Sequence, residues 1–427
     1  MALIIEQDVS SKKVEKKNEY ADAFIKRLGE DELISRYRKM DIIKTSPIYT
    51  HPPASIQDSY QFGWARGLVL LTETLVTGRW AHWLNIIRKG RLDPNDHIPT
   101  LTLKMDYTNG RKMLDRCMND VYAYGLRVEA FLDWIGFSLG LAWCKKPDMP
   151  ERLWKQLYET FNFDLLLQFP SDYLSEFLCE HGASGLAGYY PTPLNLTLLI
   201  NQITLSDGDQ TLSHYEPCLG AGAMLLPTSS YNLCGNDINL LMCKATAIQA
   251  FLYLPWLLYV PVPIIGLHFS EREMRINKYF EFTTNTRIYL GDSLIGELSA
   301  PSDIFAENGD LIDIQLHPLD LEKREIFKYD ADMLIPWAEL PNDQKYKIVV
   351  AQSRELFFDV MVSNPPFGKL NPYTMEKIRE IEKKNQQFLK ERQLRNQEEN
   401  RWLDSIVEEV EKKIQQTKDG QMELILF

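Results

Sequence analysis

The sequence lacks the cysteine spacing and the targeting segment that several classes of protein require. None of its six cysteines forms a C-x-x-C pair, so neither a structural zinc site nor a thioredoxin-like pair is encoded, and we expect reduced thiols. The first residues, MALIIEQDVSSKKVEKK, do not have the basic start, long apolar core and cleavage site of an export signal. We therefore expect a cytoplasmic protein.

Basic charge and clustered histidine are also scarce. The 47 Lys and Arg residues are outnumbered by 59 Asp and Glu, and the net charge of −12 repels nucleic acid at long range, so any DNA contact must be local or supplied by a partner. The seven histidines are dispersed without an H-E-x-x-H motif. We assign no metal site and interpret His82, His97 and His181 as ordinary surface or partly buried residues.

The sequence has no uninterrupted apolar run typical of a membrane span. The longest uncharged run, Ala245 to Leu267, is long enough to cross a bilayer, but it contains Gln249 and three prolines. We predict a buried helix followed by an extended segment, and no membrane contact.

What the sequence does contain is an ordinary globular composition over 427 residues, with 45% hydrophobic and 25% charged residues, which allows two or three domains. Residues 1–180 have helix-length apolar patterns such as Trp64 to Ile87 and Asn119 to Trp143, which predict a helical amino-terminal domain. Its tryptophans at helical spacing are expected in the core, namely Trp64, Trp80, Trp83, Trp134, Trp143 and Trp154.

From about Gly182 the pattern changes to short apolar runs that end in Gly, Asp or Asn, which predicts an α/β domain over residues 181–372. An acidic, proline-punctuated stretch between Asp292 and Asn364 (the insert at 293–357) can be an inserted hairpin or a loop. The predicted strands are Thr211 to Tyr215, Asn232 to Gly235, Thr286 to Leu290 and Phe358 to Ser363.

The last segment, 373–427, is a highly charged extension. Its apolar positions have the spacing of an amphipathic helix, which either is solvated and packed by one face or serves as a coiled-coil partner surface. These positions are Leu403, Ile406, Val407, Val410 and Ile414.

Residues suited to a flat, amino-bearing ligand follow the predicted strands. In Asn364-Pro365-Pro366-Phe367 the two prolines remove backbone donors and fix the turn, so carbonyl groups can converge as acceptors while the Phe ring offers a stacking face. Gly220 and Gly222 allow close backbone approach after the first strand. Asp237 and Asp292 end the next two strands, where carboxylates suit a ribose and an adenine amino group.

The ordered set Gly188-Tyr-Tyr-Pro-Thr192-Pro193, Glu216-Pro-x-x-Gly-x-Gly222, Asp237, Asp292 and Asn364-Pro-Pro-Phe367 resembles the S-adenosylmethionine-dependent adenine-N6 DNA methyltransferases of bacterial restriction-modification systems. The motif order matches their gamma group, although an extra proline precedes Thr192-Pro193. The resemblance covers residues 182 to 370 or so, while the first 180 residues resemble the amino-terminal domain of type I modification subunits only in being helical.

The resemblance implies a Rossmann-like S-adenosylmethionine-dependent methyltransferase sheet preceded by a helical domain, acting on DNA in restriction-modification or phage defence. It implies a catalytic turn that holds an adenine flipped out of the duplex, formed by Asn364, Pro365, Pro366 and Phe367. It also implies a cofactor site for S-adenosyl-L-methionine. Thr192, Pro193 and Glu216 would meet its methionine part, Pro217, Gly220 and Gly222 would form the loop, and Asp237, Ile238 and Asp292 would contact its adenosine.

The family has further sheet strands and a target-recognition domain after the catalytic turn, whereas 60 residues follow Phe367 here. We therefore expect a split or truncated chain, with DNA and a second polypeptide as partners and the open sheet edge covered by that partner.

Two alternatives stay open. Methyltransferases that act on protein glutamine or on guanine in ribosomal RNA share the N-P-P-F turn, but their glycine loop usually begins with Asp and lacks the equivalent of Pro217. An inactive cofactor-binding interaction subunit is favoured by the short carboxyl end, while the intact turn at Asn364 to Phe367 speaks against it.

Overall fold

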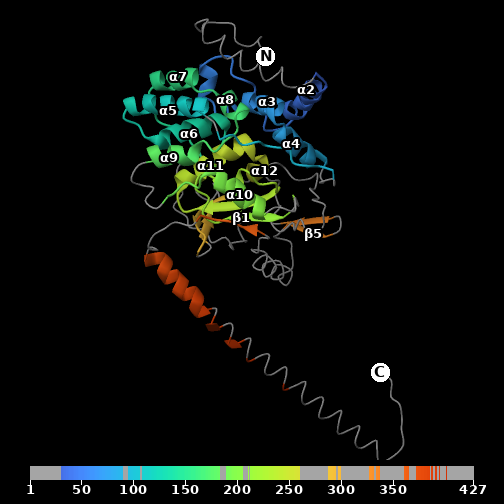
Figure 1. The fold of residues 1–427 in the computed structure, drawn as a ribbon, viewed down its shortest axis with the longest axis vertical. Coiled ribbons are helices and arrows are strands. Elements are labelled where there is room, and N and C mark those ends of the chain that lie inside the picture. Colours follow the sequence, from blue (N-terminus) through green and yellow to red (C-terminus); the bar gives the residue numbers. More distant parts are fainter. Residues whose placement is uncertain are drawn as a thin grey trace, which may run out of the picture. The chain divides into compact units, whose positions relative to one another are not determined.

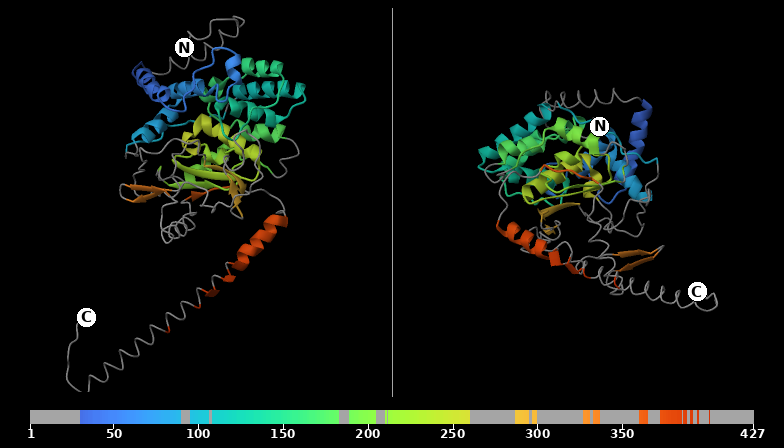
Figure 2. Two further views of the ribbon diagram at one scale, coloured as in Figure 1. Left: turned by 180° about the vertical axis from the view of Figure 1, so that it is seen from behind. Right: turned by 60° about the horizontal axis from the view of Figure 1, so that its bottom comes forward.

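The computed structural model describes residues 30–89, 95–105, 108–182, 189–204, 210, 212–259, 287–294, 297–299, 327–330, 333–336, 360–364, 372–384, 386–387, 390–391, 394 and 401. The chain divides into two units, Met1–Gly368 and Lys369–Phe427. In the first unit a helical amino-terminal region precedes a small parallel sheet with helices (Figures 1 and 2), so the predicted α/β class is confirmed at that level.

The first part of unit 1 is helical over its described residues. The helices are α2 (Glu30–Lys44), η1 (Gln57–Tyr60), α3 (Arg66–Val76), α4 (Arg79–Lys89), α5 (Thr108–Ala123), α6 (Val128–Leu139), α7 (Glu151–Thr160), α8 (Phe163–Gln168) and α9 (Leu174–His181).

Each of the two long apolar patterns is continuous in the sequence but forms two helices in the structure. Gly78, with φ 74°, separates α3 from α4, and Gly125, with φ 72°, separates α5 from α6. The apolar period continues across both glycines, but a left-handed backbone ends a helix and suits glycine best. At the first break, the buried Glu73 carboxylate accepts from the N–H groups of Arg79 (2.8 Å) and Trp80 (3.1 Å) and so caps α4.

The predicted role of the tryptophans in the core is confirmed, since all six are at most 8% exposed. Two of them also join the helical region to the second part of unit 1. Trp80 Nε1 donates to Phe251 O and Trp83 Nε1 donates to Tyr259 O, both at 2.7 Å. The same helix α4 supplies Arg79, whose Nη1 donates to Tyr253 O at 2.7 Å.

The second part of unit 1 carries the sheet, and all four predicted strands are confirmed. Strands β1, β2, β3 and β7 are parallel in the order β3-β2-β1-β7, and β4 pairs antiparallel with β3. The separate hairpin β5–β6 lies in the insert between Asp292 and Asn364. The elements are α10 (Leu194–Thr204), β1 (Ser213–Glu216), η3 (Ala223–Leu225), β2 (Asn232–Asp237), α11 (Leu240–Tyr253), α12 (Pro255–Leu258), β3 (Ile288–Asp292), β4 (Glu297–Ser299), β5 (Phe327–Asp330), β6 (Met333–Pro336) and β7 (Val360–Met361).

The buried helix predicted for the long uncharged run is α11, in which every residue from Leu241 to Tyr253 is buried. It lies between α6 and strands β2 and β3, so it is covered on both sides (Figure 1). The extended segment predicted after it falls largely at 260–267, outside the described residues. Among the described residues, no helix is both long enough and apolar enough to span a membrane.

One hydrophobic core runs through both parts of unit 1, and it includes Trp83 and Trp134 together with Leu233 and Ile288. In unit 2 a helix covers 372–384, and the apolar positions predicted for an amphipathic face, from Leu403 to Ile414, lie outside the described residues.

Candidate functional site

The predicted site residues meet at one edge of the sheet. Parallel strands present their carboxyl ends together, and the chain runs outward from β1 to β2 and β3 before it returns to the other side of β1 for β7. Ligands of open α/β sheets bind beside such a reversal of strand order. Glu216, Asp237 and Asp292 are the last residues of β1, β2 and β3, and Asn364 follows β7 closely.

Glu216 is a carboxyl group without solvent contact, with 0% exposure. Its Oε1 accepts from the N–H of Cys218 at 3.2 Å, and its Oε2 has no hydrogen bond of ordinary geometry among the described residues. Burial raises the pKa of Glu216 to about 8, with Asp237 adding to the rise, while Ser363 and the Cys218 N–H oppose it. The Ser363 hydroxyl lowers this pKa as a nearby hydrogen-bond donor, although its Oγ has no hydrogen bond of ordinary geometry to a described residue. A buried acceptor of this kind suits a cationic or N–H-bearing ligand.

Asp237 joins two of the strand-end turns. Its Oδ1 accepts from the N–H of Asn239 and its Oδ2 from the N–H of Gly220, both at 2.8 Å. Burial raises the pKa of Asp237 to about 6, against the effect of these two donors. Each carboxylate oxygen keeps a second lone pair, so the group can still accept from ligand hydroxyls. Ile238 beside it is 64% exposed, as a surface for an apolar ring requires.

The glycine loop after β1 has a left-handed backbone at both predicted glycines. Gly220 has φ 53° and Gly222 has φ 89°. A Cβ at Gly220 would lie 2.7 Å from Tyr189 Cε2, and one at Gly222 would lie 3.0 Å from Thr246 Cγ2. Packing within the chain therefore favours glycine at both positions, in addition to the predicted close approach of a ligand.

Two polar side chains from α11, which the sequence reasoning did not assign to the site, hold this loop. Thr246 Oγ1 donates to Gly220 O at 2.9 Å, and Gln249 Nε2 donates to Ala221 O at 2.7 Å and to Asp172 Oδ1 at 2.9 Å. Gln249 Oε1 also accepts from the N–H of Tyr173 at 2.9 Å. The sequence feature that could have identified Thr246 and Gln249 is their polarity within an otherwise apolar run, because buried polar groups need hydrogen-bond partners.

A second unassigned set links the ends of three strands. The Tyr215 hydroxyl on β1 donates to Asn236 Oδ1 on β2, and Asn236 Nδ2 donates to Gly291 O on β3 at 2.9 Å. This chain of bonds positions the turn that carries Asp292, whose Oδ1 accepts from the N–H of Leu294 at 3.0 Å.

Asn364 contacts the segment before α10. Its Nδ2 donates to Tyr190 O and to Thr192 Oγ1, both at 3.1 Å.

Pro193 is exposed, and its carbonyl accepts from the N–H of Thr197 in the first turn of α10. Pro217 is partly buried in the glycine loop. Of the predicted catalytic turn only Asn364 is described, since Pro365, Pro366 and Phe367 lie outside the described residues.

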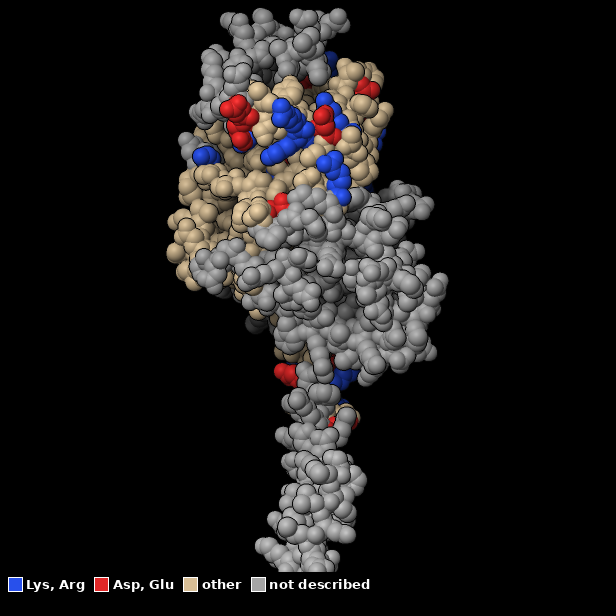
Figure 3. Space-filling model, turned by 90° about the vertical axis from the view of Figure 1, so that its right-hand side faces the viewer, with Lys and Arg blue, Asp and Glu red and all other residues tan. Residues whose placement is uncertain are grey.

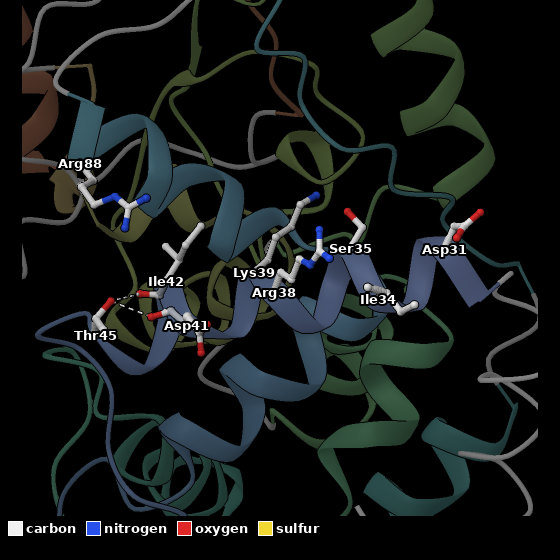
Figure 4. Close-up of a pocket in the computed structure, with 9 residues that line it drawn as sticks. All are labelled: Asp31, Ile34, Ser35, Arg38, Lys39, Asp41, Ile42, Thr45 and Arg88. Atoms are coloured by element: carbon white, nitrogen blue, oxygen red, sulfur yellow. Dashed lines mark hydrogen bonds between the residues drawn. The ribbon is translucent and has the colours of Figure 1, made fainter.

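A hollow in the helical region does not involve these residues. An open groove of about 680 Å³ is lined by α2 and α4 side chains of both charges, including Arg38, Lys39, Arg88, Asp31 and Asp41 (Figure 4). Basic and acidic side chains are likewise interspersed on the described surface in Figure 3. Neither this groove nor the described part of the face in Figure 3 therefore has the one-sign basic surface that favours binding to a nucleic acid backbone.

One group among the described residues has the spacing of metal ligands, namely Asp115, Glu180 and His181. Arg111 forms ion pairs with both carboxylates, and Tyr122 hydrogen-bonds His181 at 3.1 Å. These contacts explain why the three side chains lie together, as an ion-pair network around the end of α9.

The residues at the strand ends fit the cofactor that the resemblance implies, because a loop with a left-handed backbone is flanked by the buried Glu216 Oε2, which has no ordinary hydrogen bond to a described residue, and by the half-buried carboxylate of Asp237. Comparison of the chain with protein-family models, with curated proteins and with solved structures finds no match.

Proposed function

We propose that the chain is the cofactor-binding and catalytic part of an S-adenosylmethionine-dependent adenine-N6 DNA methyltransferase of a restriction-modification or phage-defence system. The observation that carries the proposal is the convergence of Glu216, Asp237, Asp292 and Asn364 at the carboxyl edge of a parallel sheet of order β3-β2-β1-β7. The finer fold assignment, a Rossmann-like methyltransferase sheet, is part of this proposal.

Each strand end has a defined role in this proposal. Glu216 Oε2 would accept from the ammonium group of the cofactor, because it is buried and accepts no hydrogen bond of ordinary geometry from the described residues. Asp237 would accept from the ribose hydroxyls beside Ile238, and Asp292 would accept from the adenine amino group. The bound cofactor supplies a methyl group on a sulfonium centre.

Asn364 would act on the substrate. Its side-chain oxygen accepts a hydrogen bond from the exocyclic amino group of a flipped adenine and aims the nitrogen lone pair at the methyl group. Catalysis of this type depends on orientation and needs no covalent intermediate with the protein.

The proposal includes a second polypeptide and DNA as partners. In the sheet as described, β7 is an edge strand that pairs with β1 alone, and Met361 on it is 68% exposed. An uncovered edge strand can pair with another chain. If the chain is one half of a split enzyme, it should bind cofactor alone and methylate DNA only when the second polypeptide is added, whereas turnover by the purified chain would contradict a split.

Calorimetric titration with S-adenosylmethionine tests the site. We expect saturable binding that Asp237→Ala abolishes, that Asn364→Ala leaves almost unchanged, and that Asp41→Ala, an exposed acid on α2, does not alter. Equal loss in the Asp237 and Asn364 variants, or no binding by well-folded protein, would contradict the assignment. Methylation of adenine in plasmid DNA, as against methylation of protein or ribosomal RNA, then identifies the substrate class.

A further inference from the structure

The side-chain amide of Asn364 is held in one orientation. Its Nδ2 lies 3.1 Å from the carbonyl oxygen of Tyr190 and 3.1 Å from Oγ1 of Thr192. A hydroxyl can accept or donate, but a backbone carbonyl only accepts. The atom that faces Tyr190 O must therefore be the nitrogen of the amide, since the flipped amide would place two acceptor oxygens against each other.

This orientation directs the amide oxygen away from the segment before α10. The two partners of Nδ2 both belong to the segment before α10, so Oδ1 lies on the branch that points away from that segment. Among the described residues, Oδ1 of Asn364 accepts no hydrogen bond, and it is not among the buried polar atoms that lack a partner. The direction of Oδ1 is therefore set by the two bonds that Nδ2 makes on the opposite side of the amide.

We propose that the Tyr190 carbonyl and the Thr192 hydroxyl are a positioning pair that keeps the Asn364 oxygen, rather than its NH₂ group, toward the target amino group. The inference rests on the proposed function, because an exocyclic amino group donates hydrogen bonds and is repelled by another NH₂ group. Thr192 acts here through Asn364, in addition to the contact with the methionine part of the cofactor that the resemblance implies. The Tyr190 carbonyl discriminates between the two amide orientations because it can only accept, and the Thr192 hydroxyl adds a second bond that holds the same nitrogen in place.

The orientation itself can be measured without activity. In protein labelled with ¹⁵N at asparagine, Asn364→Asp identifies the NH₂ signal of Asn364 by its disappearance. We expect this signal to exchange with water about tenfold more slowly than that of the exposed Asn195. Thr192→Val should shift the signal and speed its exchange, Thr192→Ser should restore both, and the signal of Asn162 at the start of α8 should not change.

An Asn364 signal unaffected by Thr192→Val would overturn the positioning role. Because this measurement needs neither cofactor nor DNA, it is independent of the proposed function. Failure of cofactor binding with an intact Thr192 effect would remove the methyltransferase assignment alone, while normal cofactor binding without that effect would remove the positioning pair alone.

The effect of the amide orientation on catalysis is tested with Asn364→Asp. The sample is the purified chain or its complex with the second polypeptide, whichever of the two methylates DNA. If the side chain served only as an acceptor, a carboxylate would work at least as well at neutral pH. With the positioning pair, the carboxylate faces Tyr190 O with no proton to donate, and we expect activity to fall at least about tenfold at pH 8. Protonation restores a donor, so the ratio of variant to wild-type rate should rise as the pH falls.

The Thr192 variants complete that test. Thr192→Val should lower kcat about tenfold with a smaller change in the cofactor Kd, and Thr192→Ser should recover kcat. A pH-independent ratio for Asn364→Asp together with an unchanged kcat for Thr192→Val would contradict the inference.

Discussion

The backbone N–H of Gly220 donates to Oδ2 of Asp237 at 2.8 Å, which joins the glycine loop after β1 to the acidic turn after β2. The loop is also held from α11, through Thr246 and Gln249. The predicted cofactor edge is therefore a connected set of backbone and side-chain hydrogen bonds rather than a row of independent side chains.

Gly220 also allows a test of how closely the glycine loop packs against Tyr189. Gly220→Ala places a methyl group 2.7 Å from Tyr189 Cε2 at a positive φ, whereas Gly125→Ala has a positive φ with no atom within 4 Å of the new methyl group. We expect both to lose about 1–2 kcal/mol of unfolding free energy from the backbone, and Gly220→Ala to lose about 1–3 kcal/mol more from the clash. Urea denaturation gives both values.

A double-mutant cycle separates the two causes. Tyr189→Leu in the Gly220→Ala background should recover the extra loss but not the backbone strain. Equal destabilisation by the two alanine variants would show that Tyr189 moves aside at no cost.

Glu216 is predicted to make the protein less stable as the pH rises. Its folded pKa of about 8 lies above the ordinary value of 4.5, so the folded state holds the proton that the unfolded state releases, and stability falls from about pH 4.5 to about pH 8. Glu216→Gln removes this loss. We expect the variant to exceed the wild type by a few kcal/mol at pH 8.5 and by little at pH 4.5, in denaturant titrations at both pH values.

The control for this pH effect is Glu159→Gln on α7, whose side chain is 50% exposed and should show no such dependence. A Glu216→Gln difference that is the same at both pH values would mean that the gain comes from packing or hydrogen bonding instead of charge.

Cofactor binding should release a proton from Glu216. At pH 7 a carboxyl with a pKa of about 8 is mostly protonated, and pairing with an ammonium group favours its ionised form. Titration of S-adenosylmethionine in buffers of different ionisation enthalpy should therefore give a release approaching one proton for the wild type and close to none for Glu216→Gln. Tight binding without proton release would place the ammonium group elsewhere.

The Asp133–Lys244 pair is predicted to be costly to break. Lys244 Nζ on α11 donates to Asp133 Oδ1 on α6 at 2.6 Å, and both side chains are about nine-tenths buried. Lys244→Met leaves an unpaired buried carboxylate and should cost about 3–5 kcal/mol at pH 7.5. Burial raises the pKa of Asp133, so in the variant this cost should shrink as the pH falls and the carboxyl becomes neutral.

The double variant Asp133→Leu with Lys244→Met is the matched control, since it removes both charges and should regain most of the stability. If it is no more stable than Lys244→Met alone, the loss comes from packing around α6 and α11.

The strands could be predicted from the sequence because each short apolar run ends in Gly, Asp or Asn turns or in another polar segment, which is a local pattern, whereas the order of the candidate site residues came from the family resemblance. The supports of the site could not. Thr246 and Gln249 meet the glycine loop 26 and 28 residues away, and this depends on how α11 packs on the sheet. The contact of Asn364 with Tyr190 and Thr192 joins positions 174 and 172 residues apart. The helix break at Gly78 was missed because apolar periodicity continues across it.

The three donors of α4 have a consequence for how the chain unfolds. Arg79, Trp80 and Trp83 satisfy carbonyl groups of Tyr253, Phe251 and Tyr259, at and beyond the end of the helix that supports the glycine loop. Separation of the helical region from the sheet would leave these buried acceptors without donors and expose two indole rings. The two parts of unit 1 should therefore melt in a single cooperative transition, and a fragment cut near residue 180 would lose the stability of both.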